Sequence, residues 1–173
     1  MVAGIARRRW ALCLVGPSLP FAIVPSMPEQ ATQRMVVNAS PERVWEVLTD
    51  FSEYPAWARD LKSVEVVRRD EQGRGLDVAF RAAAMGRSTS YVLRYDYSQA
   101  PHVLGWELVD GDITRTLDGS YELVPVEGDP GRTEVIYHLT VDLKAPLPGF
   151  VKRRAEARII HTALRDLRDH VES

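Results

Sequence analysis

Cysteine is nearly absent from this sequence, which contains Cys13 and no other cysteine among its 173 residues. A lone cysteine excludes a disulfide framework and a cysteine-based zinc site within one chain. The four histidines show no HExxH or His-x-His spacing, so the sequence predicts no metal site. The scarcity of cysteine is typical of proteins in a reducing compartment, and we expect this protein to be cytoplasmic.

The sequence also lacks a glycine-rich nucleotide loop, a P-loop and a nucleophile elbow. Enzymes that depend on those motifs are therefore excluded, and we expect no cofactor. Basic charge is scarce as well: apart from Arg7, Arg8 and Arg9, 19 basic side chains stand against 24 acidic ones over residues 27–173. Because a phosphate-binding surface needs a concentrated basic face, this balance argues against nucleic acid as a partner.

Residues 1–26 differ in character from the rest of the chain. Three arginines precede a short apolar stretch, as in a secretory signal, but helix-breaking residues interrupt that stretch at Gly16, Pro17, Pro20 and Pro25. The segment is too short and broken to span a bilayer. We expect it to be upstream sequence or disordered, with translation starting at Met27 or Met35 rather than at Met1. Residues 27–173 are the length of a single domain.

The segment 31–57 is the most informative part of the chain. Ser40 is a good N-cap, Pro41 suits the first helical position, and an apolar stripe follows at helical spacing, formed by Val44, Trp45, Val47 and Leu48. The aromatic turn Asp50-Phe-Ser-Glu-Tyr-Pro-Ala-Trp57 comes next. This combination resembles the opening of the START-like, helix-grip superfamily (SRPBCC). That superfamily includes polyketide cyclases/dehydrases and coenzyme-Q-binding lipid-transfer proteins.

The resemblance covers residues 31–172 and implies an α+β helix-grip fold. In that fold a curved antiparallel seven-stranded sheet wraps around a long C-terminal helix, and two short helices follow the first strand. The residue pattern agrees, because alternating apolar residues and clusters of turn residues predict strands near 31–38, 61–69, 75–85, 88–98, 102–110, 112–125 and 133–144. Short connections between them predict a meander of antiparallel neighbours.

The last segment, 151–171, contains neither glycine nor proline and predicts a helix of more than five turns. Its expected apolar stripe consists of Phe150, Val151, Ala155, Ile159, Ile160, Ala163, Leu164, Leu167 and Val171. The charged residues of the helix, Glu156 and Asp166 among them, are expected on the opposite, solvent-facing side.

We expect the inward face of the sheet and this helix to enclose a partly open apolar pocket, because alanines lie among the large side chains. A fully packed core is the alternative. The candidate ligand-binding residues inside are Phe80, Tyr91, Tyr95, Trp106, Tyr121, Tyr137, Leu139, Ile159 and Ala163. Tyr54 and Trp57 are added because the resemblance puts their connection at one lip of the cavity, where they act either as a gate or as an aromatic plug.

The function expected from this interior is binding or transport of a hydrophobic small molecule, such as a lipid, a quinone or an aromatic polyketide. The first alternative is a polyketide cyclase/dehydratase (aromatase) that uses inward tyrosines as acids and His161 as a base. No catalytic residue is assigned, because acid–base catalysis needs a polar partner beside the phenols and the inward positions provide none. The second alternative is a protein-interaction module with a protein partner.

Overall fold

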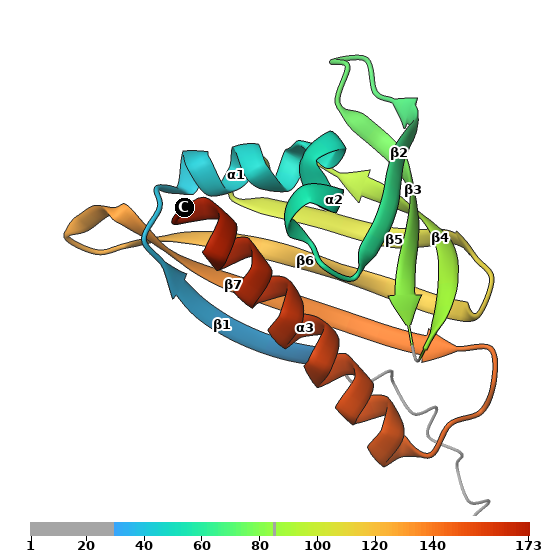
Figure 1. The fold of residues 1–173 in the computed structure, drawn as a ribbon. Coiled ribbons are helices and arrows are strands. Elements are labelled where there is room, and N and C mark those ends of the chain that lie inside the picture. Colours follow the sequence, from blue (N-terminus) through green and yellow to red (C-terminus); the bar gives the residue numbers. More distant parts are fainter. Residues whose placement is uncertain (1–29, 85) are drawn as a thin grey trace, which may run out of the picture.

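In the computed structural model, residues 30–84 and 86–173 are described, and the predictions for residues 1–26, Met27 and position 85 lie outside them. The chain forms a two-layer α+β structure in which a curved sheet holds a long helix against its concave face (Figure 1). The strands are β1 (Ala31–Val37), β2 (Leu61–Arg69), β3 (Gly75–Ala84), β4 (Arg87–Asp96), β5 (Val103–Gly111), β6 (Thr114–Val126) and β7 (Asp129–Leu143). The helices are α1 (Pro41–Thr49), the 3-10 turn η1 (Phe51–Glu53), α2 (Tyr54–Trp57) and α3 (Gly149–Val171).

The sheet is a single antiparallel meander in the order β1-β7-β6-β5-β4-β3-β2. The other described strands pair with their neighbours in sequence, whereas β1 pairs with the last strand, β7. Ala31 lies opposite Leu139 and Val37 lies opposite Thr133. The predicted helix-grip fold, with seven strands, two short helices and a long C-terminal helix, is confirmed.

The turn between β6 and β7 is tighter than predicted. The predicted strands 112–125 and 133–144 left residues 126–132 for the connection, but Val126 pairs directly with Asp129 and the turn consists of Glu127 and Gly128. Gly128 has a φ of 76°, a left-handed conformation that glycine adopts without strain. Proline is tolerated near the start of a strand, so Pro130 does not prevent β7 from beginning at residue 129.

Helix α1 begins as predicted. The Ser40 side chain accepts a hydrogen bond from the Arg43 backbone N–H at 3.3 Å, and Pro41 is the first helical residue. The buried side of α1, formed by Val44, Val47 and Leu48, faces the sheet core. The helix therefore closes one end of the curved sheet, beside α2 (Figure 1).

The expected stripe of α3 is correct for Ile160, Leu164, Leu167 and Val171, which are buried against the core, and wrong for Ile159 and Phe150, which are 39% and 68% exposed. Val151 and Ala155 are half-buried. Figure 1 shows that α3 crosses the sheet diagonally and begins past the strands, where Phe150 lies in its first turn.

Two carboxylates of α3 are buried, contrary to the prediction that they face solvent. Asp166 is 4% exposed and accepts hydrogen bonds from the Arg59 backbone N–H at 3.0 Å and from Arg59 Nε at 2.8 Å. Glu156 is 2% exposed and accepts one from the Val141 N–H at 3.3 Å. Val141 lies beyond the end of β1 on strand β7, so the carboxylate bonds to a sheet edge that β1 does not reach.

Candidate functional site

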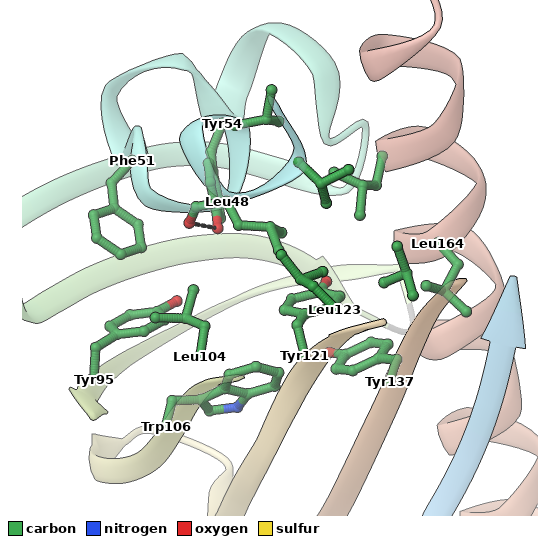
Figure 2. Close-up of a cluster of buried hydrophobic side chains, with 14 of the residues drawn as sticks. Leu48, Phe51, Tyr54, Tyr95, Leu104, Trp106, Tyr121, Leu123, Tyr137 and Leu164 are labelled. Carbon is green, nitrogen blue, oxygen red and sulfur yellow. Dashed lines mark hydrogen bonds between the residues drawn. The ribbon is translucent and has the colours of Figure 1, made fainter. Parts of the chain in front are cut away.

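The interior of the sheet is dominated by aromatic side chains from several elements. Tyr54 comes from α2, Tyr95 from β4, Trp106 from β5, Tyr121 from β6 and Tyr137 from β7, and all five are buried. Figure 2 shows them converging with leucines from α1, β5, β6 and α3. Alternation along the strands puts Tyr95, Trp106, Tyr121 and Tyr137 on the concave face, as predicted. Tyr54, which was expected at one lip of the cavity, is buried in the same cluster.

Tyr121, Tyr137 and Trp106 form the centre of this cluster. The two phenol rings stack with centroids 4.5 Å apart, and the Tyr137 hydroxyl donates a hydrogen bond to the Tyr121 oxygen. The Trp106 ring lies 5.3 Å from Tyr121 and 5.5 Å from Tyr137. Gly119 makes room for the indole, because a Cβ there would be 2.6 Å from Trp106 Cζ2.

The tyrosines differ in whether their hydroxyl groups form a hydrogen bond with another part of the protein. Tyr54 donates to the Leu48 carbonyl at 2.6 Å, drawn as a dashed line in Figure 2, and Tyr97 donates to the Gly75 carbonyl at 2.8 Å. The hydroxyls of Tyr91 and Tyr95 have no hydrogen-bond partner among residues 30–84 and 86–173.

These two hydroxyls are not sealed inside protein. In the described part of the chain, the only fully enclosed side-chain polar atoms without a partner are Trp57 Nε1 and Arg165 Nε. The Tyr91 and Tyr95 oxygens therefore border space that a water-sized atom can occupy. Because buried polar groups are nearly always hydrogen-bonded, an occupant of that space would meet two phenols ready to bond.

Burial raises the pKa of the phenols of Tyr54, Tyr91, Tyr95, Tyr121 and Tyr137 well above the usual value of 10, and neighbouring acidic or phenolic groups add to the effect. Desolvation disfavours the charged phenolate, so these groups stay neutral in the physiological range. A neutral phenol can donate one hydrogen bond and accept others. The interior thus offers hydrogen-bond donors in an apolar, aromatic setting.

The remaining predicted lining residues divide into two groups. Phe80 on β3 is buried and stacks on Tyr91 at 5.4 Å, Leu139 on β7 is fully buried, and Ala163 on α3 lies partly buried at the edge of the core. Ile159 does not join them, because its side chain is 39% exposed although the adjacent Ile160 is buried in the core.

Trp57 lies against the C-terminal part of α3. Its ring stacks on His170 at 5.8 Å and meets Tyr54 edge-on at 4.9 Å. The neighbouring bonds from Arg59 to Asp166 hold the same connection to the helix. Such contacts are compatible with the aromatic plug, and the choice between plug and gate stays a prediction.

His161, named as the base in the enzymatic alternative, is exposed on α3. Sequence reasoning missed Glu156, the carboxylate between α3 and β7. Its i+4 spacing to Ile160 and i+8 spacing to Leu164 put it on the buried stripe. That spacing is the signal that could have found it.

Two hollows open at the surface next to the aromatic cluster. The first, of about 330 Å³, lies between α1–η1 and the β2–β3 hairpin and is lined by Trp45, Thr49, Asp50, Phe51, Ser52, Val66, Arg69, Gly73, Arg74 and Gly75. We call it the hairpin pocket. The second, of about 440 Å³, lies over β2, β3, β4 and the end of β5 and includes Glu65, Phe80, Arg81, Tyr91, Asp110 and Asp112. Neither was predicted, because each is formed by elements distant in sequence.

Within the described ranges no group of three or more histidine, cysteine, aspartate or glutamate side chains is placed to hold a metal ion. None of the described helices is long and apolar enough to cross a bilayer.

Comparison with known proteins gives one family and several similar folds. Residues 28–172 match the family described as polyketide cyclase/dehydrase and lipid transport. No curated protein matches the sequence. A START superfamily protein from Mycobacterium smegmatis is 22% identical, with a TM-score of 0.78, over 83% of this chain and 97% of its own.

Two further solved structures have the same fold. One, from Thermus thermophilus, is 20% identical with a TM-score of 0.69, over 83% of this chain and 97% of its own. The Zhui aromatase/cyclase from a Streptomyces species is 16% identical with a TM-score of 0.72, over 83% of this chain and 93% of its own. At these identities the similarity establishes the fold alone.

Proposed function

The chain belongs to the polyketide cyclase/dehydrase and lipid transport family, and we propose that it binds a hydrophobic small molecule between the sheet and α3. The ligand class is an apolar or aromatic molecule that carries a carbonyl or hydroxyl group, such as a quinone, an aromatic polyketide or a lipid. Tyr91 and Tyr95 supply its hydrogen bonds, and the rings of Phe80, Trp106 and Tyr137 contact its apolar body.

One observation carries this proposal: the Tyr91 and Tyr95 hydroxyls are not fully enclosed and have no hydrogen-bond partner among the described residues, whereas the Tyr54 and Tyr97 hydroxyls bond to backbone carbonyls. A core built only for packing would satisfy its phenols or replace them with phenylalanine. Two phenols left free beside an apolar cluster match the usual composition of a small-molecule site, which is mostly apolar with a few polar groups that fix orientation.

The test is a titration of the full chain with a naphthoquinone that bears a decyl tail, compared with decylnaphthalene. Tryptophan quenching reports binding of the quinone, because Trp106 lies within the cluster, and displacement of a bound dye reports binding of the hydrocarbon. We expect saturable binding of both, with the quinone tighter. Mass spectrometry of an organic extract of gently purified protein is the second measurement. If neither probe binds and the extract contains no stoichiometric small molecule, the proposal fails.

A second candidate function, cyclisation and dehydration of a carbonyl-rich polyketide, is favoured by the raised pKa values of the buried phenols. A phenol that stays protonated can donate to a substrate carbonyl or enolate. The test compares product profiles from a poly-β-ketone for the wild type, Tyr95→Phe and Tyr137→Phe. His161→Ala serves as the exposed control. Identical profiles in all four proteins would remove the enzymatic proposal and leave the binding proposal intact.

A protein partner stays a weaker proposal. The large apolar side chains that are exposed in the described residues are spread over β1, β2, β5, the β5–β6 turn and α3: Val36, Val67, Val109, Ile113, Phe150 and Ile159. A scattered set of this kind is usual on a monomer surface.

A further inference from the structure

The hairpin pocket reaches the aromatic interior at one side chain, Phe51. This residue lines the hairpin pocket from η1, and it is only 3% exposed because its ring extends inward. The ring lies 4.6 Å from Tyr95 and 5.4 Å from Tyr54. Figure 2 shows it at the edge of the cluster, above Tyr95. One face of Phe51 therefore belongs to the pocket and the other to the proposed ligand site.

The backbone of β3 passes directly behind Phe51. A Cβ on Gly75 would lie 2.8 Å from two carbons of the Phe51 ring, so only glycine leaves room for it. The ring thus fills the gap between η1 and β3. It is held there by aromatic contacts, and η1 itself is a three-residue turn without a side-chain cap. Rotation of one side chain would join the hairpin pocket to the interior.

The second hollow also borders the cluster, at Phe80 and Tyr91, but its charge is different. Three carboxylates line it, from Glu65, Asp110 and Asp112, against the single guanidinium of Arg81. The hairpin pocket has two guanidinium groups against the single carboxylate of Asp50. An anionic group is therefore attracted to the hairpin pocket and repelled from the second hollow.

The two arginines of the hairpin pocket are not equally available. Arg74 bonds to Asp70 at 2.7 Å and lies over the Tyr97 ring at 4.2 Å. Arg69 donates only to the Gly73 carbonyl, at 2.8 Å, and has no carboxylate partner in the described part of the chain. No other acceptor for its guanidinium is found among the described residues, and a guanidinium matches the geometry of a carboxylate or phosphate.

We infer that the hairpin pocket is the entrance to the proposed ligand site, that Phe51 is its gate, and that Arg69 binds the anionic end of an amphipathic ligand whose apolar part passes Phe51 into the aromatic cluster. This inference rests on the proposed function and makes the ligand class narrower: an apolar chain or ring system that ends in a carboxylate or phosphate.

The first test concerns the anionic end. The full chain is titrated with the fluorescent fatty acid cis-parinaric acid and with its methyl ester. We expect Arg69→Gln to weaken binding of the acid by about fivefold, the effect of one exposed charge-assisted contact, and to leave the ester within about twofold. Arg68→Gln is the matched control: it removes the same charge from the adjacent residue, whose guanidinium bonds to Asp77 at 2.8 Å. It should change neither affinity.

The second test concerns the gate, measured by stopped-flow mixing with the same acid. Phe51→Leu keeps an apolar side chain but shortens it, so association and dissociation rates should both rise by roughly threefold or more while the Kd stays within about twofold. Phe150→Leu, the same exchange at an exposed position, should leave both rates unchanged. Phe51→Trp, which fills the gap further, should slow both rates.

The outcomes separate the two proposals. If the wild type binds neither the acid nor the ester, both the proposed function and this entrance are overturned. If it binds them but Arg69→Gln and Arg68→Gln behave alike, and the Phe51 variants keep wild-type rates, only the entrance is overturned.

Discussion

Removing single hydroxyl groups from Tyr54 and Tyr95 tests the central structural observation, because both residues are buried and differ in their hydrogen bonds. The Tyr54 hydroxyl donates to the Leu48 carbonyl at 2.6 Å. Helix α1 ends at Thr49, so that carbonyl is among the last four of the helix and has no partner within it. Tyr54→Phe leaves it buried and unpaired, which we expect to cost about 1.5 kcal/mol of unfolding free energy.

The same change at Tyr95 removes a hydroxyl that bonds to no described residue. Tyr95→Phe should therefore leave the unfolding free energy within about 0.5 kcal/mol of the wild-type value, or raise it slightly. Binding should respond in the opposite way. A lost hydrogen bond of about 1 kcal/mol weakens binding of the decyl naphthoquinone by about fivefold. Decylnaphthalene, which has no carbonyl, should bind with unchanged affinity.

Urea unfolding measures the first quantity and fluorescence titration the second, on the same two variants and the wild type. Equal m-values are required so that the midpoints can be compared as stabilities. The reasoning is refuted if Tyr95→Phe destabilises the protein as much as Tyr54→Phe, because the Tyr95 hydroxyl would then have a partner in the protein. It is also refuted if quinone affinity is unchanged by Tyr95→Phe.

Three further predictions concern stability. Asp166→Ala should lower the unfolding free energy by about 2 kcal/mol, since it removes the buried acceptor that ties α2 to α3, whereas Asp169→Ala, at an exposed position, should cost less than about 0.5 kcal/mol in the same urea assay. Gly119→Ala should cost about 2–3 kcal/mol because its Cβ would collide with the His138 carbonyl oxygen and with the Trp106 ring, and a thermal midpoint equal to wild type would contradict the close approach. Burial raises the pKa of Tyr97 to about 12. Because the unfolded chain ionises near 10, stability should be constant below about pH 10 and fall as the pH rises to about 12, which unfolding across that range and phenolate absorbance would check.

The sequence predicts the fold well because its signals are local. Ser40 and Pro41 start α1 through a cap and a preset φ, and neither depends on distant residues. The period-two alternation along β4 puts Leu93 and Tyr95 on the buried face whatever the neighbouring strands are. Most of the proposed lining follows from this rule alone.

The wrong predictions concern residues of α3 whose burial depends on the neighbouring elements that contact them. Ile159 is apolar and Glu156 is charged, yet the isoleucine is exposed and the glutamate is buried. Helical spacing puts Glu156 on the stripe of Ile160 and Leu164, but only the end of β1 before Val141 gives its carboxylate a backbone N–H to bind. The same holds for Asp166, whose burial depends on the Arg59 N–H groups that reach it.

The sequence by itself determined the order and type of the elements and which strand face is apolar, because dihedral preferences and side-chain alternation act over a few residues. Only the tertiary structure decided which phenols have no partner among the described residues, that Phe51 separates a surface pocket from the interior, and that Arg69 lines that pocket with no carboxylate of the described chain bound to it. Those properties arise from contacts between residues tens of positions apart, and their free energies depend on distance and burial, which no local pattern contains.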